Sequence, residues 1–442
     1  MMSILLRKLK ETFYRNVARE ISLVSQYFEQ VVFFHPREGD VLALTPWIQA
    51  KARYVWSRDE CRDEGGKENP IQTLFLLHGN LNYSLDIEDL LRDLNSVCER
   101  SSRVLIVMYN PYLSGLYRLL TWLGIRSGEL PCTFVTWANL IHLTCLSQFE
   151  VVRRRRCGYW PFRWRGLGTF LERLFSIVPL LKHLGLVELL LLRPQKRELN
   201  HRPLLSVVIP SRNEKGNIEP ALKRLESLDI PFEVVFVEGG STDDTWDEIR
   251  RLILKYQGSF SIQAFQQSGR GKADAVRLGF AKAKGELLSI LDADLTTPPE
   301  LLPRFYRAFV SGMGDFISGS RLIYPMEGEA MRFINRIGNV FFAKTLSYVM
   351  DTHIGDSLCG TKLLSKRDYG RMLQWREQFG NFDPFGDFEL LFPAAVLGLG
   401  IVDVPIRYRA RTYGQTNIHR FRHGFLLLKM VMVGFLKIKL GF

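Results

Sequence analysis

The sequence predicts an α/β protein of two domains that are joined near residue 200. The chain has 442 residues, which at about 150 residues per domain suggests two or three folded units. From residue 203 onward, short β-branched apolar runs alternate with amphipathic segments, and residues 71–110 show a weaker form of the same alternation. Such alternation indicates parallel sheets whose ligands bind at the carboxyl ends of the strands.

The N-terminal domain is expected over residues 1–198. Residues 1–21 interleave basic and apolar side chains and predict an amphipathic helix rather than a cleaved leader. IQTLFLLHG and SRVLIVMYN read as buried strands around a helix over 84–98. FEVVRRRR and LGLVELLLLRP follow and are expected to add edge strands.

The second domain is expected over residues 203–420. LLSVVIPSRNE reads as its first strand, followed by a helix over Ile218–Leu228, a strand over Phe232–Val237, a helix over Thr245–Tyr256 and a strand over Glu286–Leu291. Residues 421–442 predict an amphipathic helix with Lys429, Lys437 and Lys439 towards one side. A helix packed on the second domain is the alternative for this segment.

Composition and charge narrow the function classes. With 46% hydrophobic and 24% charged residues, the chain is not disordered, collagen-like or fibrous. The net charge of +13 is compatible with nucleic acid, an anionic membrane surface or a phosphorylated small molecule. Much of this surplus lies in residues 151–202, where RRRRCGYWPFRWR mixes arginines with aromatic residues. Together with the C-terminal helix, this segment favours an anionic membrane surface over a solvated basic loop.

Cysteine spacing and hydropathy add two exclusions. The six cysteines form no Cys-x-x-Cys pair, which argues against a zinc site or disulfide scaffold and favours a reducing compartment. The chain has no uninterrupted apolar run of about 18 residues, so a membrane span is not expected.

The strongest chemical signal is LSILDADLTTPPE, in which Asp292 and Asp294 directly follow a buried strand. Two carboxylates at a strand end suit Mg²⁺ or Mn²⁺, which prefers oxygen ligands and often shares them with substrate phosphates. A solvated Asp-x-Asp turn would be the commoner explanation for this motif alone.

Three other loops favour the metal site over a solvated turn, because each of them suits a nucleotide diphosphate. Pro210 and the polar residues Arg212, Asn213 and Glu214 lead from a strand into a helix, where backbone donors gather. Glu238 closes the next strand, and Gly239 and Gly240 permit close approach before a helix capped by Ser241 or Thr242. In QQSGRGKADAV, Arg270 and Lys272 suit a diphosphate.

In this order and spacing, the four segments resemble glycosyltransferase family 2, enzymes of the GT-A type. DADLTTPPELLPRF is most similar to the polyprenyl-phosphate sugar synthases. The resemblance implies a Rossmann-like fold, Asp292 and Asp294 as the metal-binding acids, and a nucleotide-sugar pocket lined by the loops above. Glu238-Gly239 stands where many members have Asp-Asp or Asp-Gly, which leaves the nucleotide base open.

Later motifs extend the resemblance. Arg321 in GDFISGSR is expected to contact phosphate, and Asp356 and Gly360 in IGDSLCGTKLLSK are expected near the acceptor. VPIRYRARTYGQTNI resembles the segment that closes over the diphosphate, and it offers Arg411 and Gln415. In FGDFELLF, Asp387 and Glu389 would share a face on a strand but not on a helix.

The predicted function is metal-dependent, inverting transfer of a sugar from a nucleotide-sugar to a lipid-phosphate or glycan acceptor in envelope polysaccharide or glycolipid synthesis. A hydroxyl acceptor needs a base, for which Asp387 is the first candidate and Asp356 the second. For a lipid phosphate, which is already ionised, a base is less necessary. The expected location is cytoplasmic, peripheral at the inner face of the cytoplasmic membrane. An inactive scaffold and a nucleic-acid binder are the alternatives, although no nucleic-acid module accompanies the arginines.

The N-terminal domain resembles the later half of a class I S-adenosylmethionine methyltransferase, through DLLRDLNSVCERSSRVLIVMYNPYLSGLYRLLTWLG. In GDVLALTPWIQ, however, Pro46 and Trp47 stand where the cofactor loop of that family needs small residues. The expectation is a degenerate domain that does not methylate and binds no S-adenosylmethionine.

Overall fold

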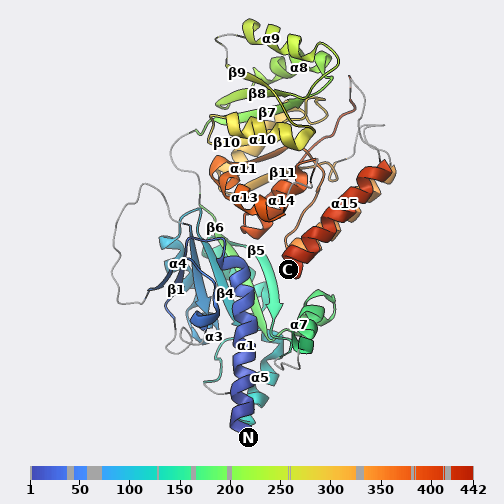
Figure 1. Cartoon of the computed structure of the whole chain (residues 1–442). Helices are drawn as coiled ribbons and strands as arrows, with labels where there is room; N and C mark the ends of the chain where they lie inside the picture. The colour runs from blue at the N-terminus through green and yellow to red at the C-terminus, as the bar shows by residue number, and fades with distance from the viewer. Residues whose placement is uncertain are drawn as a thin grey trace. The chain divides into compact units, whose positions relative to one another are not determined.

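The computed structural model divides the chain into two compact units, residues 1–196 and residues 197–440 (Figure 1). The structure describes residues 2–36, 44–56, 72–126, 129–160, 166–196, 202–256, 258, 260–324, 333–379, 383, 385–411, 413 and 420–441. Both units are α/β, as the strand–helix alternation predicts.

The first unit is a six-stranded sheet in the order β2-β1-β3-β4-β6-β5. Its strands are β1 (Gln30–Phe34), β2 (Arg53–Trp56), β3 (Thr73–His78), β4 (Arg103–Tyr109), β5 (Phe149–Cys157) and β6 (Val187–Pro194). Its helices are α1 (Met2–Ser25), α3 (Asn80–Tyr83), α4 (Ile87–Val97), α5 (Ser114–Trp122), α6 (Trp137–Leu146) and α7 (Leu167–Ile177), with short 3₁₀ turns at Thr45–Trp47, Pro111–Leu113 and Leu181–Leu184. Helix α1 packs on one face of the sheet, and α4 and α6 on the other.

One of the two expected edge strands is not an edge. Strand β6 lies antiparallel between β4 and β5, and every one of its residues is buried. Its sequence VELLLLRP is apolar on both faces because both faces are covered. Strand β5 is an edge, as expected, and pairs only with β6 among the described strands.

The arginine-rich segment belongs to β5 and does not face a membrane as four free side chains. Arg153 is 5% exposed, Arg155 lies 3.3 Å from Glu20, and Arg154 and Arg156 both bind the buried carboxylate of Glu188. The strand therefore uses these charges internally, which removes the main argument for lipid contact here. The aromatic stretch that follows, residues 161–165, lies outside the described residues.

The second unit is a seven-stranded sheet in the order β13-β11-β12-β10-β7-β8-β9. Its strands are β7 (Leu205–Ser211), β8 (Phe232–Glu238), β9 (Ser261–Gln266), β10 (Leu287–Ile290), β11 (Phe316–Ser320), β12 (Lys362–Ser365) and β13 (Ile401–Pro405). All neighbouring strands run parallel except β12, which is antiparallel to both β10 and β11.

The helices of the second unit are α8 (Lys215–Leu225), α9 (Thr245–Lys255), α10 (Lys272–Lys282), α11 (Leu302–Val310), α12 (Phe333–Met350), α13 (Lys366–Phe379), α14 (Asp387–Val396) and α15 (Arg420–Gly434). A 3₁₀ turn at Pro299–Leu301 precedes α11, and a π-helical turn at Phe435–Lys439 follows α15. The helix expected over Ile218–Leu228 thus starts and ends three residues earlier.

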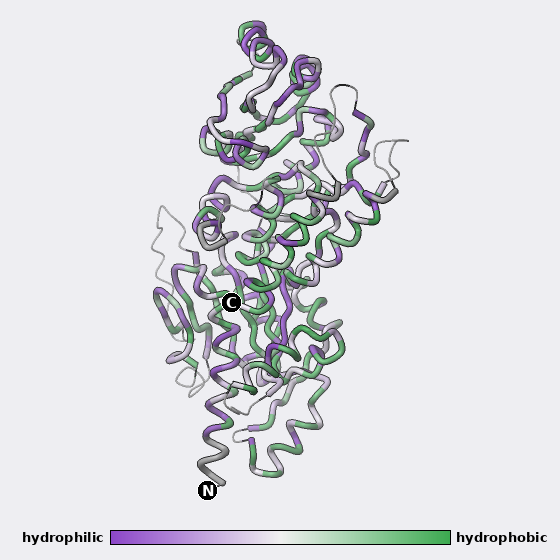
Figure 2. Tube along the Cα trace, turned by 45° about the vertical axis from the view of Figure 1, so that its right-hand side comes forward, coloured by the Kyte–Doolittle hydropathy of each residue, from purple (hydrophilic) through white to green (hydrophobic). Residues whose placement is uncertain are grey.

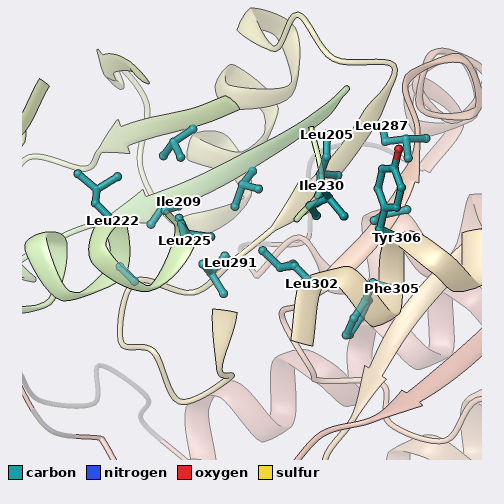
Figure 3. Packing of buried hydrophobic residues seen from close by; sticks show 14 of the residues in the cluster. Leu205, Ile209, Leu222, Leu225, Ile230, Leu287, Leu291, Leu302, Phe305 and Tyr306 are labelled. Carbon is teal, nitrogen blue, oxygen red and sulfur yellow. The ribbon is translucent and has the colours of Figure 1, made fainter. Parts of the chain in front are cut away.

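A continuous apolar core holds α8, α9 and α11 against one face of this sheet (Figure 3). It includes Leu205 and Ile209 of β7, Leu222 of α8, and Leu302 and Phe305 of α11. Hydrophobic (green) and hydrophilic (purple) stretches occur in both units (Figure 2). Gly279 lets α10 approach the opposite face, since a Cβ there would clash with Val208 of β7. The strand ends that carry the predicted motifs are therefore set on a rigid base.

Candidate active site

The predicted motifs meet where the strand order of the second sheet reverses. β7 and β10 are adjacent, and the chain proceeds from β7 to β8 on one side and from β10 outward on the other. In open α/β sheets this reversal leaves a crevice at the carboxyl ends of the strands, where ligands bind. Ser211 and Glu238 are register partners at the ends of β7 and β8, and Asp292 and Asp294 follow β10.

The first acid of the Asp-x-Asp motif is paired with a lysine from the start of α10. Lys272 Nζ donates to Asp292 Oδ1. Burial alone would raise the pKa of the Asp292 carboxyl, but the neighbouring ammonium outweighs burial and holds that pKa below its usual range. Burial would likewise lower the pKa of Lys272, and the carboxylates of Asp292 and Asp387 raise it instead. Both groups are therefore charged at neutral pH.

The second acid is held by its own turn and by an arginine. Asp294 Oδ1 accepts hydrogen bonds from Thr296 N at 3.1 Å and Thr296 Oγ1 at 2.8 Å. Its Oδ2 lies 2.6 Å from Arg411 Nη2, and Arg411 Nη1 lies 3.6 Å from Glu214 Oε1. Arg411 therefore lies between the metal motif and the β7–α8 loop.

The β7–α8 and β8–α9 loops are tied to each other. Asn213 has a left-handed backbone (φ 57°), its N–H donates to Ser241 Oγ, and its Oδ1 accepts from Thr242 N at 2.8 Å. Glu214 N donates to Thr245 Oγ1 at 3.0 Å, and burial raises the pKa of the Glu214 carboxyl. The predicted cap residues Ser241 and Thr242 thus bind the neighbouring loop and do not cap their own helix.

Glu238 is buried at the end of β8 and supports the glycine turn. Its carboxylate accepts from Ser241 N and from Gln266 Nε2. Gly240 has φ 69°, in the left-handed region, with open space where a side chain would be. Pro210 is half-buried in β7, and Arg212 and Arg270 are exposed beside these loops. Gln415 lies outside the described residues.

Arg321 and Asp356 form a buried two-pronged ion pair. Arg321 Nε and Nη2 donate to the two carboxylate oxygens at 2.7 and 2.9 Å, and Asp356 also accepts from the Arg321 and Leu358 backbone N–H groups. Burial would raise the pKa of Asp356, but Arg321 holds it low. The Asp356 side chain is 0% exposed, so this geometry argues against its role as a base.

Asp387 lies at the first turn of α14, a helix, so it does not share a strand face with Glu389. Gly386 precedes it with φ 82°, and the fully buried Lys362 donates to Asp387 Oδ1 and to Cys359 O. Glu389 instead binds Arg277 at 2.9 Å and Arg376 at 2.8 Å. The Asp387 side chain is 10% exposed, whereas that of Asp356 is fully buried.

Sequence reasoning missed two residues that shape this site. Lys362 neutralises Asp387 from the start of β12, and Asp383 accepts hydrogen bonds from the N–H groups of Phe385, Phe388 and Glu389 at 2.9, 2.9 and 3.0 Å. Asp383 stands shortly before α14, a pattern typical of helix caps that could have revealed it. Lys362 carries no such local signal.

The carboxylates present fit a divalent cation whose remaining ligands come from the substrate. The described residues contain no group of three or more His, Cys, Asp and Glu side chains able to hold a metal by themselves. Asp292 and Asp294 supply carboxylate oxygens from one turn, which matches Mg²⁺-type sites built from one or two carboxylates plus substrate phosphates.

Comparison with known proteins identifies the family of the chain. The model of "Glycosyl transferase family 2" matches residues 206–372. Dolichyl-phosphate hexose transferase of Haloferax volcanii is 30% identical over 229 residues, which cover 52% of this chain and 92% of that protein. Dolichol-phosphate mannosyltransferase of Pyrococcus furiosus is 27% identical over 240 residues, covering 51% of this chain and 64% of that one. The chain belongs to glycosyltransferase family 2.

Among solved structures, a mannosyltransferase of Pyrobaculum calidifontis in complex with GDP-Man and Mn²⁺ is similar at 19% identity and a TM-score of 0.37, covering 55% of this chain and 66% of that one. The family model matches residues of the second unit. The methyltransferase resemblance of the first unit stays a prediction.

Proposed function

We propose that the chain transfers a sugar from a nucleotide-sugar to a lipid-phosphate acceptor with the help of Mg²⁺ or Mn²⁺. The observation that carries this proposal is the set of four carboxylates, each paired with a cation, around the strand reversal of the second sheet. The pairs are Asp292 with Lys272, Asp294 with Arg411, Asp356 with Arg321, and Asp387 with Lys362. The names of the relatives above, which act on dolichyl phosphate, support the acceptor class.

On the donor side, this chain's residues bind and orient the leaving diphosphate. Asp292 and Asp294 would hold the metal, which when bound neutralises charge on the leaving group. Arg411 reaches Asp294 and Glu214 from one position and can contact an anion placed between them. Lys272 and the exposed Arg270 flank the start of α10, where N–H groups also favour anions. Pro210, Arg212, Asn213, Glu238 and Gly240 would line the nucleotide side of the pocket.

On the acceptor side, the charge pairing favours a nucleophile that is already ionised. Asp356 is locked by Arg321, and Asp387 is bound by Lys362, so neither is poised to take a proton from a hydroxyl. A phosphate oxygen is already ionised and needs no base. If a glycan hydroxyl is the acceptor instead, Asp387 is the better base because it retains some exposure. Attack opposite the leaving group implies inversion at the anomeric carbon.

Membrane contact follows from the acceptor class, and α15 is the surface we assign to it in the second unit. Phe425 is 74% exposed, Leu428 47% and Met432 57%, while Leu427 and Met430 pack inward. Residues 420–442 contain basic residues and no acid, so the outward face suits an anionic bilayer surface.

Lys439 is an exception to the predicted lysine face, since it is 4% exposed and binds Asp351. None of the described helices is long and apolar enough to cross a membrane. We place the chain at the cytoplasmic face.

The decisive experiment offers nucleotide-sugars with each base to the full chain, with a polyprenyl phosphate in detergent and with Mg²⁺, Mn²⁺ or EDTA. Sugar transfer to the lipid phosphate, lost with EDTA and in Asp294→Ala, is expected. Asp247→Ala on α9, whose side chain is 65% exposed, is the matched control and should retain activity. Transfer that persists in EDTA and in Asp294→Ala would remove the metal assignment.

The same assay separates the remaining functions. An inactive scaffold would give no transfer or donor hydrolysis under any condition. A nucleic-acid binder would show salt-dependent retention of random duplex. The internal pairing of Arg154, Arg155 and Arg156 argues against the latter, because those charges already have partners.

A further inference from the structure

Helix α5 of the first unit presents apolar side chains to solvent. Six side chains between residues 112 and 125 are at least 39% exposed: Tyr112 at 67%, Leu116 at 39%, Leu119 at 50%, Trp122 at 81%, Leu123 at 53% and Ile125 at 46%. Single exposed apolar residues are ordinary, but a continuous group of this kind marks an interaction surface. We call these six residues the α5 surface.

The α5 surface is one face of the helix and its flanks. Leu116 and Leu119 lie one turn apart on the same face of α5, with Trp122 one turn after Leu119. Tyr112 and Leu123 flank the helix at its two ends. The opposite side carries Tyr117, which is 2% exposed, donates its hydroxyl to Leu186 O at 2.5 Å and stacks near Phe134. The contacts of Tyr117 fix the inner face of the helix against the first unit. Its apolar residues on the other side therefore face solvent in a well-packed helix.

The charged residues within the segment that forms the α5 surface are both basic. Residues 111–126 contain Arg118 and Arg126 and no acid. Arg118 is exposed on α5 one turn before Trp122, where its aliphatic stem can cover apolar surface while its guanidinium reaches an anion. Arg126 donates to Tyr83 Oη at 2.7 Å and to Glu129 O at 2.8 Å and so braces the end of the segment. A tryptophan, a tyrosine and arginines around leucines are typical of membrane interfaces.

We propose that the α5 surface is a membrane-docking site that inserts into the headgroup boundary of an anionic bilayer. Helix α5 has nine residues, far too few to cross a bilayer, so it lies in the plane of the interface. The first unit therefore contributes its own lipid contact, separate from α15 of the second unit. This inference does not depend on the donor, acceptor or metal assigned above.

Vesicle flotation of the full chain tests the proposal. The double variant Leu119→Ser/Trp122→Ser should lower binding to vesicles of phosphatidylcholine with phosphatidylglycerol by about tenfold or more, since two interfacial anchors are lost. Leu254→Ser on α9, which replaces a leucine that is 74% exposed, is the control and should bind as the unaltered chain does. Unfolding temperatures of all variants should agree, because the changed side chains are on the surface.

Brominated lipids locate the contact itself. Trp122 should account for a component of tryptophan quenching by these lipids, and Trp122→Phe should remove that component while keeping vesicle binding within about twofold. Equal quenching in Trp122→Phe and the unaltered chain would overturn the proposal, as would unchanged flotation of the double variant. A change from dimer to monomer in the double variant without a change in flotation would assign the surface to a second copy of the chain and also overturn it. Absence of sugar transfer would contradict the proposed function but would not change the interpretation of the flotation and quenching results.

Discussion

At the residue scale, Asp403 carries a pH dependence that the sequence does not reveal. Burial raises the pKa of its carboxyl to about 6, while its Oδ2 accepts from Gly355 N at 2.8 Å. Because the folded-state pKa lies above that of the unfolded chain, this group favours folding below about pH 4, and that contribution is lost as the pH rises to about 6.

Asp403→Asn should therefore stabilise the second unit by about 2 kcal/mol at pH 8 and by little at pH 4, since the amide keeps the acceptor without the charge. Urea unfolding at both pH values measures the difference. Equal stabilisation at the two pH values would show that ionisation is not the cause.

Gly360 is a second residue-scale feature, because it leaves room for the Lys272–Asp292 pair. A Cβ at this position would clash with Lys272 Nζ and with Asp292 Oδ2. Gly360→Ala should lower kcat at least about tenfold by displacing that pair, with a small change in the unfolding temperature. Gly370→Ala is the matched control: nothing lies within 4 Å of its Cβ position, and alanine should stabilise α13 by about 0.5–1 kcal/mol. Full activity in Gly360→Ala would mean that the pair is not needed in this geometry.

Site residues that carry a local sequence signal could be predicted from the sequence. Asp292 and Asp294 stand directly after a strand, and both lie at the strand reversal. Sequence reasoning could not reach Lys362, whose partner Asp387 is 25 positions away, or the binding of Arg411 to Asp294 across 117 positions. It also took the arginines of β5 as free charges, because the buried partners Glu20 and Glu188 come from distant segments.

At the element scale, α14 depends on one carboxylate for its first turn. Asp383 accepts from the N–H groups of Phe388 and Glu389 in that turn and of Phe385 just before it. Burial, followed by the neighbouring Asp387, raises the pKa of Asp383. Asp383→Ala should destabilise the second unit by about 1–2 kcal/mol and lower kcat by misplacing Asp387. Asp383→Asn should restore part of both, because an amide oxygen still accepts. Measurements of thermal unfolding and of kcat check this prediction. A loss of stability with unchanged kcat would show that Asp383 caps α14 without positioning Asp387 for the reaction.

Elements with a clear period were predicted, and those defined by topology were not. Strands β7, β8 and β10 lie where apolar runs end in turn residues. Strand β6 was mistaken for an edge, because an apolar run shows burial but not which neighbours provide it. The antiparallel β12 has only four residues, Lys362–Ser365, and was too short to yield a pattern.

At the scale of the whole molecule, the two units should unfold separately. Each has its own sheet and apolar cores, and the division falls at residues 196 and 197. Calorimetry should show two transitions, and a nucleotide diphosphate with Mn²⁺ should raise only one of them, because ligands stabilise the unit that binds them. Asp294→Ala should abolish that shift. A single transition that moves as a whole would show that the units unfold together.

The position of β6 also sets an order of events during synthesis. Among the described strands, β5 pairs only with β6, which is the last of them along the first unit. While β5 has left the ribosome and β6 has not, the arginine-rich strand has no neighbouring strand to pair with, and Glu188, which neutralises two of its arginines, is not yet in place. The first unit can close only when residues 187–194 emerge, just before the second unit begins to appear. The nascent chain thus passes through an interval in which a chaperone would find a basic, unpaired strand edge.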